Sequence, residues 1–353
     1  MFCVAIVSDR EIATREAYGK ALVELGRQNN NVVVLDADLA KSTQTIKFAK
    51  EFPDRFFDVG IAEANMIGIG AGLAACGMVV FCSSFAIFAT QRVLNQIFQS
   101  VAYPGLNVKI AASHAGISVG EDGATHQSVD DISIMRSIPN MTIVVPADAH
   151  EAYEATFAAA NFEGPVYLRL SRMATPVVTP PGKPFEIGKA IVLREGKDIT
   201  ITACGIMVYE ALGAAERLSG LGVEAEVINY NTIKPFDKDT LVDSLIKTRA
   251  VLSVEEHSII GGLGSAIAEC VAEEFPVAMA RVGIRDQFGQ SGKSLDLLKH
   301  YQLTSEDIAK EALKLLETKR KANEIYEISA STKSNFEPLG PEVEGGMSDE
   351  GSN

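Results

Sequence analysis

Three short segments of the sequence concentrate side chains that could do chemistry, and each directly follows an apolar run. The segments are DVGIAEANM around Glu63, SSFAIFATQR with Phe85 and Phe88, and SHAGISVGEDGATHQS at residues 113–128. In an open parallel α/β sheet, ligands bind beyond the carboxyl ends of the strands. If the apolar runs are strands, the three segments would converge on one cleft.

Glu63 lies between the end of an apolar run and a nearly all-apolar helical pattern. A carboxyl group in such a dry setting could share a proton with a nitrogen of a ligand. A carboxylate in the first turn of a helix is also stabilised by the helix dipole, so capping would equally explain it. On this segment alone, both interpretations stay open.

Phe85 and Phe88 are three residues apart among small residues, a pattern that suits a flat slot for an aromatic ring. Taken alone, the pair would be better explained as two core side chains on one helix face. A ligand slot therefore needs support from the neighbouring segments.

The glycine-rich third segment gathers polar side chains that packing does not require, namely His114, Glu121, Asp122, His126 and Gln127. Its histidines and acids could suggest a metal site, but they have no fixed ligand spacing. Imidazoles that hold sugar oxygens explain the pattern equally well.

The elements that must position these segments alternate along the chain in the manner of a parallel α/β sheet. Between residues 12 and 177, amphipathic or small-residue helical patterns separate apolar runs, which predicts a doubly wound, mostly parallel sheet in a domain at residues 1–177. The expected strands are NVVVLDAD, FFDVG, MVVFCS, VKIAAS, MTIVVPAD and VYLRLS.

A proline-rich stretch at 178–186 predicts a linker, and the α/β alternation then repeats on a smaller scale at 187–320. The strands expected in this second α/β domain are DITITACG, VEAEVINY, AVLSVEEH and VAMARVGI. Residues 321–353 are polar and acidic, which predicts a disordered tail.

The composition excludes several functional classes. A net charge of −14 argues against nucleic acid as a partner, and no apolar run is long enough to span a membrane. The opening residues lack the apolar core of a secretory signal and the five cysteines are scattered, so we expect a cytoplasmic protein with reduced thiols. Small phosphorylated substrates remain compatible, because a local cluster of donors can bind a phosphate.

The order of the motifs resembles a known family. GIAEANM, SSFAIF, SHAGISVGEDGATHQ, IPNMTIVVPAD and LRLSR are similar to the pyrimidine-binding domain of transketolase, a thiamine-diphosphate-dependent enzyme. NTIKPFD and VEEHSIIGGLGSAIAE resemble the smaller transketolase C-terminal domain that follows it. The resemblance extends from about residue 12 to residue 316 and implies the same two α/β domains.

The resemblance also implies a set of cofactor contacts. A glutamate at the position of Glu63 hydrogen-bonds the pyrimidine ring and favours the form of the cofactor that activates itself. Phe85 and Phe88 would line the slot for this ring. The matching positions add Asp38, Ile61 and Gln91, although many transketolases have a tyrosine where this chain has Gln91.

By the same resemblance, His114 and His126 would act with Glu63 in catalysis while a two-carbon ketol unit passes from a ketose phosphate to an aldose phosphate. The substrate would be held by Arg15, Ser42, His114, Asp122, His126 and Arg172. Arginine suits the phosphate end, because its planar fork matches phosphate oxygens. Sugars of the pentose phosphate pathway are the default expectation.

One motif of the family is absent: the sequence contains no GDG followed by an asparagine, with which these enzymes grip the diphosphate through a divalent metal. The chain is also about half as long as a complete transketolase. We therefore expect no metal ligands here. A separate N-terminal subunit would bind the diphosphate and Mg²⁺ or another divalent cation, in an α2β2 heterotetramer active only when both chains are present.

Four alternatives remain to be weighed. Half of a deoxyxylulose-phosphate synthase would usually have arginine where this chain has His114, and the beta subunit of a 2-oxo-acid dehydrogenase usually lacks the GEDGATHQ loop. The glycines of MIGIGAG could suggest a nucleotide-binding oxidoreductase, but they do not form GxGxxG after a strand. A non-catalytic scaffold would not explain the retained Glu63.

Overall fold

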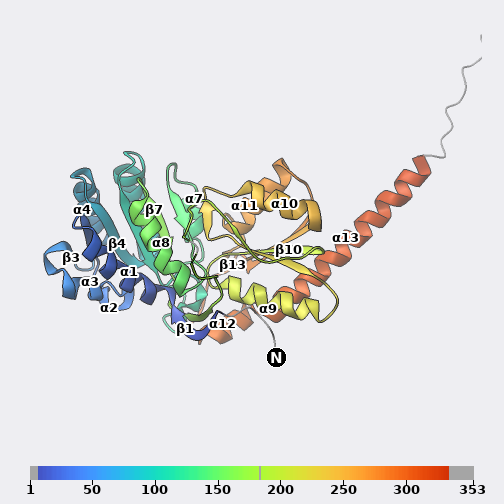
Figure 1. The fold of residues 1–353 in the computed structure, drawn as a ribbon, viewed down its shortest axis with the longest axis horizontal. Coiled ribbons are helices and arrows are strands. Elements are labelled where there is room, and N and C mark those ends of the chain that lie inside the picture. Colours follow the sequence, from blue (N-terminus) through green and yellow to red (C-terminus); the bar gives the residue numbers. More distant parts are fainter. Residues whose placement is uncertain (1–6, 183, 334–353) are drawn as a thin grey trace, which may run out of the picture.

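The computed structural model describes residues 7–182 and 184–333, which fold into two α/β units that lie side by side (Figure 1). The first is built on a seven-stranded sheet and the second on a five-stranded sheet. Both sheets are mostly parallel, which confirms the predicted fold class.

The first sheet contains all six strands predicted for it. In spatial order they are β6 (Thr142–Val144), β7 (Val166–Arg169), β5 (Val108–Ser113), β4 (Val79–Phe85), β2 (Val32–Asp36) and β3 (Phe56–Asp58). These six strands run parallel. Their carboxyl ends therefore meet along one edge of the sheet.

Alternating residues of these strands face two different hydrophobic layers. On β2, Val32 and Val34 pack with α1 (Thr14–Gln28) and α8 (Ala149–Asn161), whereas Val33 and Leu35 pack with α4 (Glu63–Ala75). Since successive strand residues point to opposite faces, both faces of the sheet are covered by helices. This is the doubly wound arrangement.

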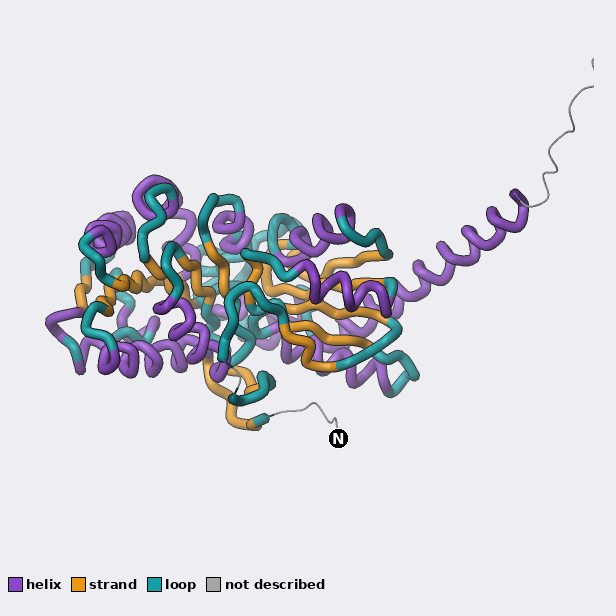
Figure 2. Tube along the Cα trace, turned by 45° about the horizontal axis from the view of Figure 1, so that its top comes forward, coloured by secondary structure: helices purple, strands orange, loops and turns teal. Residues whose placement is uncertain are grey.

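The second sheet has the spatial order β14 (Ala278–Ile284), β13 (Ala250–Ser258), β10 (Ile199–Ala203), β11 (Ala225–Asn229) and β9 (Ile191–Arg194). Only the edge strand β9 pairs antiparallel. The helices of this unit are α9 (Met207–Ser219), α10 (Lys238–Thr248), α11 (Leu263–Glu273), α12 (Ser294–His300) and α13 (Ser305–Lys333). Figure 2 shows them, in purple, around the orange strands.

The two units share a sheet and a core. A short strand of the second unit, β12 (Thr232–Lys234), pairs antiparallel with β6 and becomes the seventh strand of the first sheet. One hydrophobic cluster contains Ile132 and Met135 of the first unit together with Ile233 and Leu263 of the second. The units are therefore joined by buried apolar surface as well as by the linker.

Several short elements complete the first unit. β1 (Ser8–Ala13) pairs antiparallel with β8 (Ala174–Val177), which ties the start of α1 to the end of the first unit. The others are α2 (Ala40–Thr43), α3 (Ile46–Glu51), η1 (Pro53–Arg55), α5 (Ala86–Thr90), η4 (Ile117–Val119) and α7 (Asp131–Arg136).

The sequence pattern of TQRVLNQIFQSVAY, between two apolar strands, predicts a helix, but in the structure this helix is broken. The segment forms a 3-10 turn, η2 (Gln91–Val93), one helical turn, α6 (Leu94–Gln96), and a π-helical turn, η3 (Ile97–Ala102). Gln91 and Arg92, at the break, hydrogen-bond Asp130 and Glu63 outside the helix. Such irregular turns often occur where side chains serve a site.

The end of the chain also differs from expectation. Helix α13 continues to Lys333, so residues 321–333, assigned above to a disordered tail, are helical. The segment from Ser305 to Lys333 is rich in Ala, Glu, Lys and Leu, which have high helix propensity. The rest of the expected tail, 334–353, lies outside the described residues. Among the residues that the structure covers, none forms a helix long and apolar enough to cross a membrane.

Candidate functional site

The residues singled out in the sequence follow the carboxyl ends of neighbouring parallel strands. β4 ends at Phe85, β5 ends directly before His114, and Arg172 comes shortly after β7. Arg15 reaches the same edge from the first turn of α1, where the hydroxyl of Thr14 accepts a hydrogen bond of 2.7 Å from the backbone N–H of Ser171. The topology thus gathers groups that are far apart in the sequence.

Glu63 is buried in the first turn of α4, and its partner is an arginine. The guanidinium of Arg92 donates a hydrogen bond of 3.0 Å to Oε1 of Glu63. The same guanidinium lies 3.9 Å from the centre of the Phe88 ring. Arg92 was not recognised in the sequence, although Phe88 and Arg92 are four residues apart, a spacing at which helical side chains meet.

Phe85 and Phe88 form a stacked pair, with ring centres 5.9 Å apart and an interplanar angle of 16°. His114 stacks on Phe85 at 3.8 Å, and His126 meets Phe88 edge-on at 5.4 Å. The two phenylalanines of one predicted segment and the two histidines of another thus form one aromatic group. Ordinary core phenylalanines would not need histidines as neighbours.

His114 is held as a neutral imidazole. Burial, followed by the charges of Arg15, Arg172 and His126, lowers its pKa from 6.5 to about 3. Nε2 lies 3.4 Å from Nη1 of Arg15 and Nδ1 lies 2.8 Å from Oγ of Ser113. Because arginine can only donate, Nε2 accepts and Nδ1 carries the proton.

The cationic end of the site lies on the other side of His114. Arg15 donates to the carbonyl oxygen of Ser42 at 2.8 Å, and Arg172 pairs with Asp122 at 3.1 Å. Burial and then the charge of Arg172 lower the pKa of Arg15, and the buried Nε of Arg15 has no hydrogen-bond partner among the described residues. Two neighbouring guanidiniums with an unpaired donor are suited to an anion.

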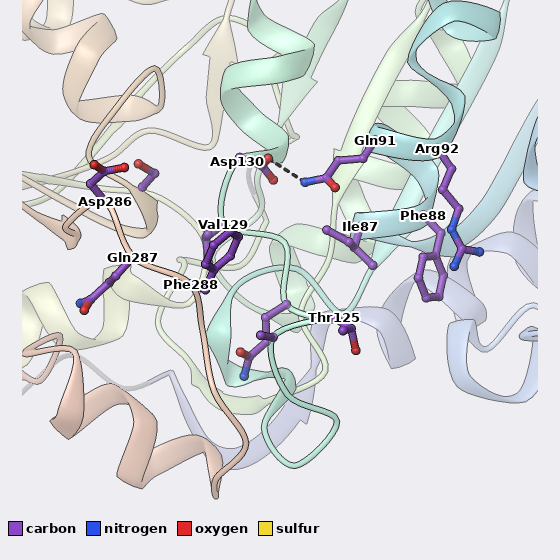
Figure 3. A pocket seen from close by; sticks show the side chains of 13 residues that line it. Ile87, Phe88, Gln91, Arg92, Thr125, Val129, Asp130, Asp286, Gln287 and Phe288 are labelled. Carbon is purple, nitrogen blue, oxygen red and sulfur yellow. Dashed lines mark hydrogen bonds between the residues drawn. The ribbon is translucent and has the colours of Figure 1, made fainter.

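A cavity of about 640 Å³ opens beside the aromatic group, between the two units (Figure 3). Its wall includes Phe88, Arg92 and Thr125 from the first unit and Asp286 and Phe288 from the second. Gln91 also lines it and donates a hydrogen bond of 2.7 Å to Asp130. The wall contributed by the second unit was not anticipated from the sequence.

Two of the predicted contacts stand apart from this group. Asp38 follows β2 with a positive φ of 63°, and its backbone N–H donates a hydrogen bond of 3.0 Å to Oδ1 of Asp58. Ile61 is 76% exposed just before α4. Both lie at the carboxyl edge of the sheet, on the side of β2 and β3.

The donors fit the pyrimidine end of thiamine diphosphate. A buried carboxylate beside a stacked aromatic pair can hydrogen-bond a ring nitrogen while the ring lies against an aromatic face. Among the described residues, no three His, Cys, Asp or Glu side chains are grouped to hold a metal ion. The fold and site together define a two-domain α/β protein with an aromatic and carboxylate site at the sheet edge.

Comparison with known families identifies both units. Residues 10–177 match the pyrimidine-binding domain of transketolase, and residues 188–308 match the transketolase C-terminal domain. A protein of Methanocaldococcus jannaschii described as a transketolase C-terminal section is 50% identical over 299 residues, which cover 84% of this chain and 94% of that protein.

Two further relatives are informative. A 6-deoxy-6-sulfo-D-fructose transketolase subunit of Clostridium sp. is 46% identical, over 86% of this chain and 95% of its own length. A solved structure described as a split gene transketolase in an inactive beta4 tetramer is 51% identical, with a TM-score of 0.82, and covers 87% of this chain and 99% of its own.

The chain belongs to the transketolase family of thiamine-diphosphate-dependent transferases and corresponds to the C-terminal subunit of split-gene transketolases. The family inferred from the motifs is confirmed. The deoxyxylulose-phosphate synthase, 2-oxo-acid dehydrogenase and scaffold alternatives find no support among these relatives.

Proposed function

We propose that this chain transfers a two-carbon ketol unit from a ketose phosphate to an aldose phosphate, using thiamine diphosphate that it shares with an N-terminal partner subunit. The observation that carries the proposal is the buried Glu63 beside the stacked Phe85 and Phe88. Bound thiamine diphosphate supplies an electron sink that lets a carbon–carbon bond next to a carbonyl break.

Glu63 would hold a proton at a nitrogen of the pyrimidine ring, while Phe85 and Phe88 orient the ring. Asp38, Ile61 and Gln91 would complete the contacts to the cofactor at the same edge of the sheet. His114 and His126 flank the aromatic pair, where their ring nitrogens could hold the substrate carbonyl and hydroxyls. The neutral state of His114 suits this role, since a neutral imidazole can both donate and accept.

Arg15, Ser42 and Arg172 would bind the anionic end of the sugar, with Asp122 bonding a hydroxyl. The mutual repulsion of the two guanidiniums supports this, because an anion between them would relieve it. A sulfonate is also a tetrahedral oxyanion. The relative named for 6-deoxy-6-sulfo-D-fructose therefore makes a sulfonated sugar a specific second substrate to test.

The partner subunit would cover an apolar surface next to Glu63. Exposed apolar side chains here are Ile61, just before α4, Leu94 of α6 and Phe98 of η3. The three elements α4, α6 and η3 pack together. Gly70 of α4 lies tightly against Cys82, but Gly68 and Gly72 face open space. We propose that a subunit carrying the diphosphate and a divalent cation docks here, in an α2β2 assembly.

The test is ketol transfer from xylulose 5-phosphate to ribose 5-phosphate by this chain, alone and mixed with a candidate N-terminal subunit, thiamine diphosphate and Mg²⁺. A parallel reaction uses 6-deoxy-6-sulfofructose as donor. We expect activity only in the mixture. Activity of this chain alone would contradict the shared site, and inactivity of the mixture with every donor would contradict the proposed reaction.

The variant Glu63→Gln tests the assigned role within the mixture. It should lower kcat by about a hundredfold or more, the scale of a lost acid–base contact. Glu51→Gln is a matched control, because Glu51 also pairs with an arginine, Arg27, but lies at the end of α3. Near wild-type turnover of Glu63→Gln would contradict the assignment.

A further inference from the structure

The loop that carries His114, Asp122 and His126 is supported from the second unit. The side chain of Ser294 donates a hydrogen bond of 2.7 Å to the carbonyl oxygen of Ser118. Gln127 of the loop donates to the carbonyl oxygen of Gln290 at 2.9 Å. The loop of the first unit therefore rests on the segment 289–294 of the second.

Glu256, at the end of β13 in the second unit, makes the most buried of these contacts. Its Oε1 accepts a hydrogen bond of 2.5 Å from the backbone N–H of Ser118, four residues after His114. A Cβ on Gly116 would lie 2.3 Å from Cδ of Glu256, and Gly116 has a φ of +80°. The loop backbone thus closes directly over the carboxyl group.

Glu256 is itself fixed from the first unit. Arg169 donates to the backbone carbonyl oxygen of Glu256 at 3.0 Å and forms two hydrogen bonds with Asp131. Tyr167 also donates to Asp131, at 2.7 Å. These groups are all buried, so the carboxyl group of Glu256 has little freedom to move.

We propose that Glu256 is a positioning residue for ketol transfer: its carboxyl group holds the backbone at Ser118 so that His114, Asp122 and His126 meet the sugar. This inference rests on the proposed function and gives the second unit a part in substrate binding. Because Glu256 is not one of the residues assigned to the cofactor, its replacement should weaken binding of the sugar and not of thiamine diphosphate.

A purely structural role would not call for a carboxyl group at this place. Burial raises the pKa of Glu256 to about 7, against the favourable effects of Arg169 and the Ser118 N–H. A group whose ionised form is disfavoured by burial weakens a core, and an apolar side chain would usually serve packing better. The backbone N–H of Ser118, which points at Oε1 of Glu256, explains why a hydrogen-bond acceptor is needed here.

The test compares Glu256→Ala, Glu256→Gln and Glu256→Asp in the assembled enzyme. Glutamine keeps an acceptor at the same reach, whereas alanine removes it and aspartate withdraws it by one methylene. We expect KM for the sugar phosphate to rise about tenfold in the alanine and aspartate variants, the factor for the loss of one hydrogen bond. The glutamine variant should restore KM to near the wild-type value, with the Kd of thiamine diphosphate unchanged in all three.

Glu151→Ala is the matched control. Glu151 is also wholly buried, also has its pKa raised to about 7, and also accepts a backbone N–H, that of Ala147, while bonding Asn229 of the second unit. It bonds no residue of the loop at 113–128 in the described hydrogen bonds. Its loss should lower the melting temperature without changing KM.

Hydrogen exchange of the Ser118 amide measures the contact between Ser118 and Glu256 without any enzyme assay. Exchange should be faster in Glu256→Ala and Glu256→Asp than in the wild type, and near wild type in Glu256→Gln and Glu151→Ala. Unchanged exchange would overturn the contact, and faster exchange with an unchanged KM would overturn its role in substrate binding.

If the alanine variant does not fold, the aspartate and glutamine variants make the same comparison. An inactive wild-type mixture would overturn the proposed function, and the exchange result would still decide the contact.

Discussion

Arg92 occupies the position that the proposed function gives to the pyrimidine ring. Its guanidinium is planar, lies over Phe88 and donates an N–H to Glu63, as a protonated nitrogen of the ring would. A ring that stacks on Phe88 and bonds Glu63 must therefore displace this side chain. The rival explanation, a plain ion pair at the protein surface, predicts no effect on the cofactor.

Arg92→Ala should consequently bind thiamine diphosphate more tightly in the assembled enzyme. Arg92 is half exposed, so its two contacts are each modest, and the Kd should fall roughly threefold to tenfold. Isothermal titration with Mg²⁺ present measures this Kd. Arg27→Ala removes an exposed Arg–Glu pair elsewhere and should leave the Kd of thiamine diphosphate unchanged. A higher Kd in Arg92→Ala would mean that Arg92 helps to hold the cofactor.

His114 should remain neutral throughout the physiological range. With a pKa of about 3 in the fold, its Cε1–H resonance should not titrate between pH 8 and pH 5. Arg15→Met should raise this pKa but leave it below 6.5, because burial is the larger cause. A wild-type midpoint near 6.5 in NMR titration would contradict the burial of the ring.

The same shift makes His114 lower the stability of the fold in acid. The unfolded chain takes up a proton near pH 6.5, whereas the folded chain does so only near pH 3. The stability that depends on neutral His114 is therefore present above pH 6.5 and is lost as pH falls toward 3.

At the scale of elements, α13 divides into two parts. Ile308, Ala312 and Leu315 are buried against the second unit, where α13 contacts α9 and β14. Lys319 donates to the carbonyl oxygen of Thr248 at 2.7 Å. Beyond these contacts the helix extends away from the body of the protein in both views (Figures 1 and 2).

Two changes in α13 should therefore have opposite outcomes. Leu315→Ala should lower the free energy of unfolding by about 2–5 kcal/mol, as expected for a core leucine. Ending the chain after Lys321 should leave it unchanged to within about 0.5 kcal/mol, the usual size of surface effects. Urea denaturation measures both, and a large loss on truncation would mean that the distal part of the helix contributes to the fold.

At the scale of the whole molecule, the two units should unfold together. Strand β12 lies in the sheet of the first unit, and one hydrophobic cluster includes residues of both. Neither unit can open without exposing apolar surface of the other. Calorimetry should show one transition, with a calorimetric enthalpy close to the van't Hoff value. Two separated transitions would show that the junction is weak.

The parallel strands, the main helices, the family and the segments that carry the site could all be predicted from the amino-acid sequence. These follow from local signals, since strand and helix periods are read within ten or fifteen residues. Glu63 and His114 come after strands, and Phe85 is the last residue of one. The spacing of Phe88 and Arg92 was also a local signal, but the broken helix that sets their contact was not.

Which distant groups meet could be seen only in the folded chain. Ser118 and Glu256 are 138 residues apart, and β12 joins β6 across the domain junction. Such contacts depend on how sheets and loops pack, and no periodic pattern in one segment encodes its neighbour in another. The position of the site at the carboxyl edge of the sheet could be predicted. The cavity wall that the C-terminal unit contributes could be seen only in the folded chain.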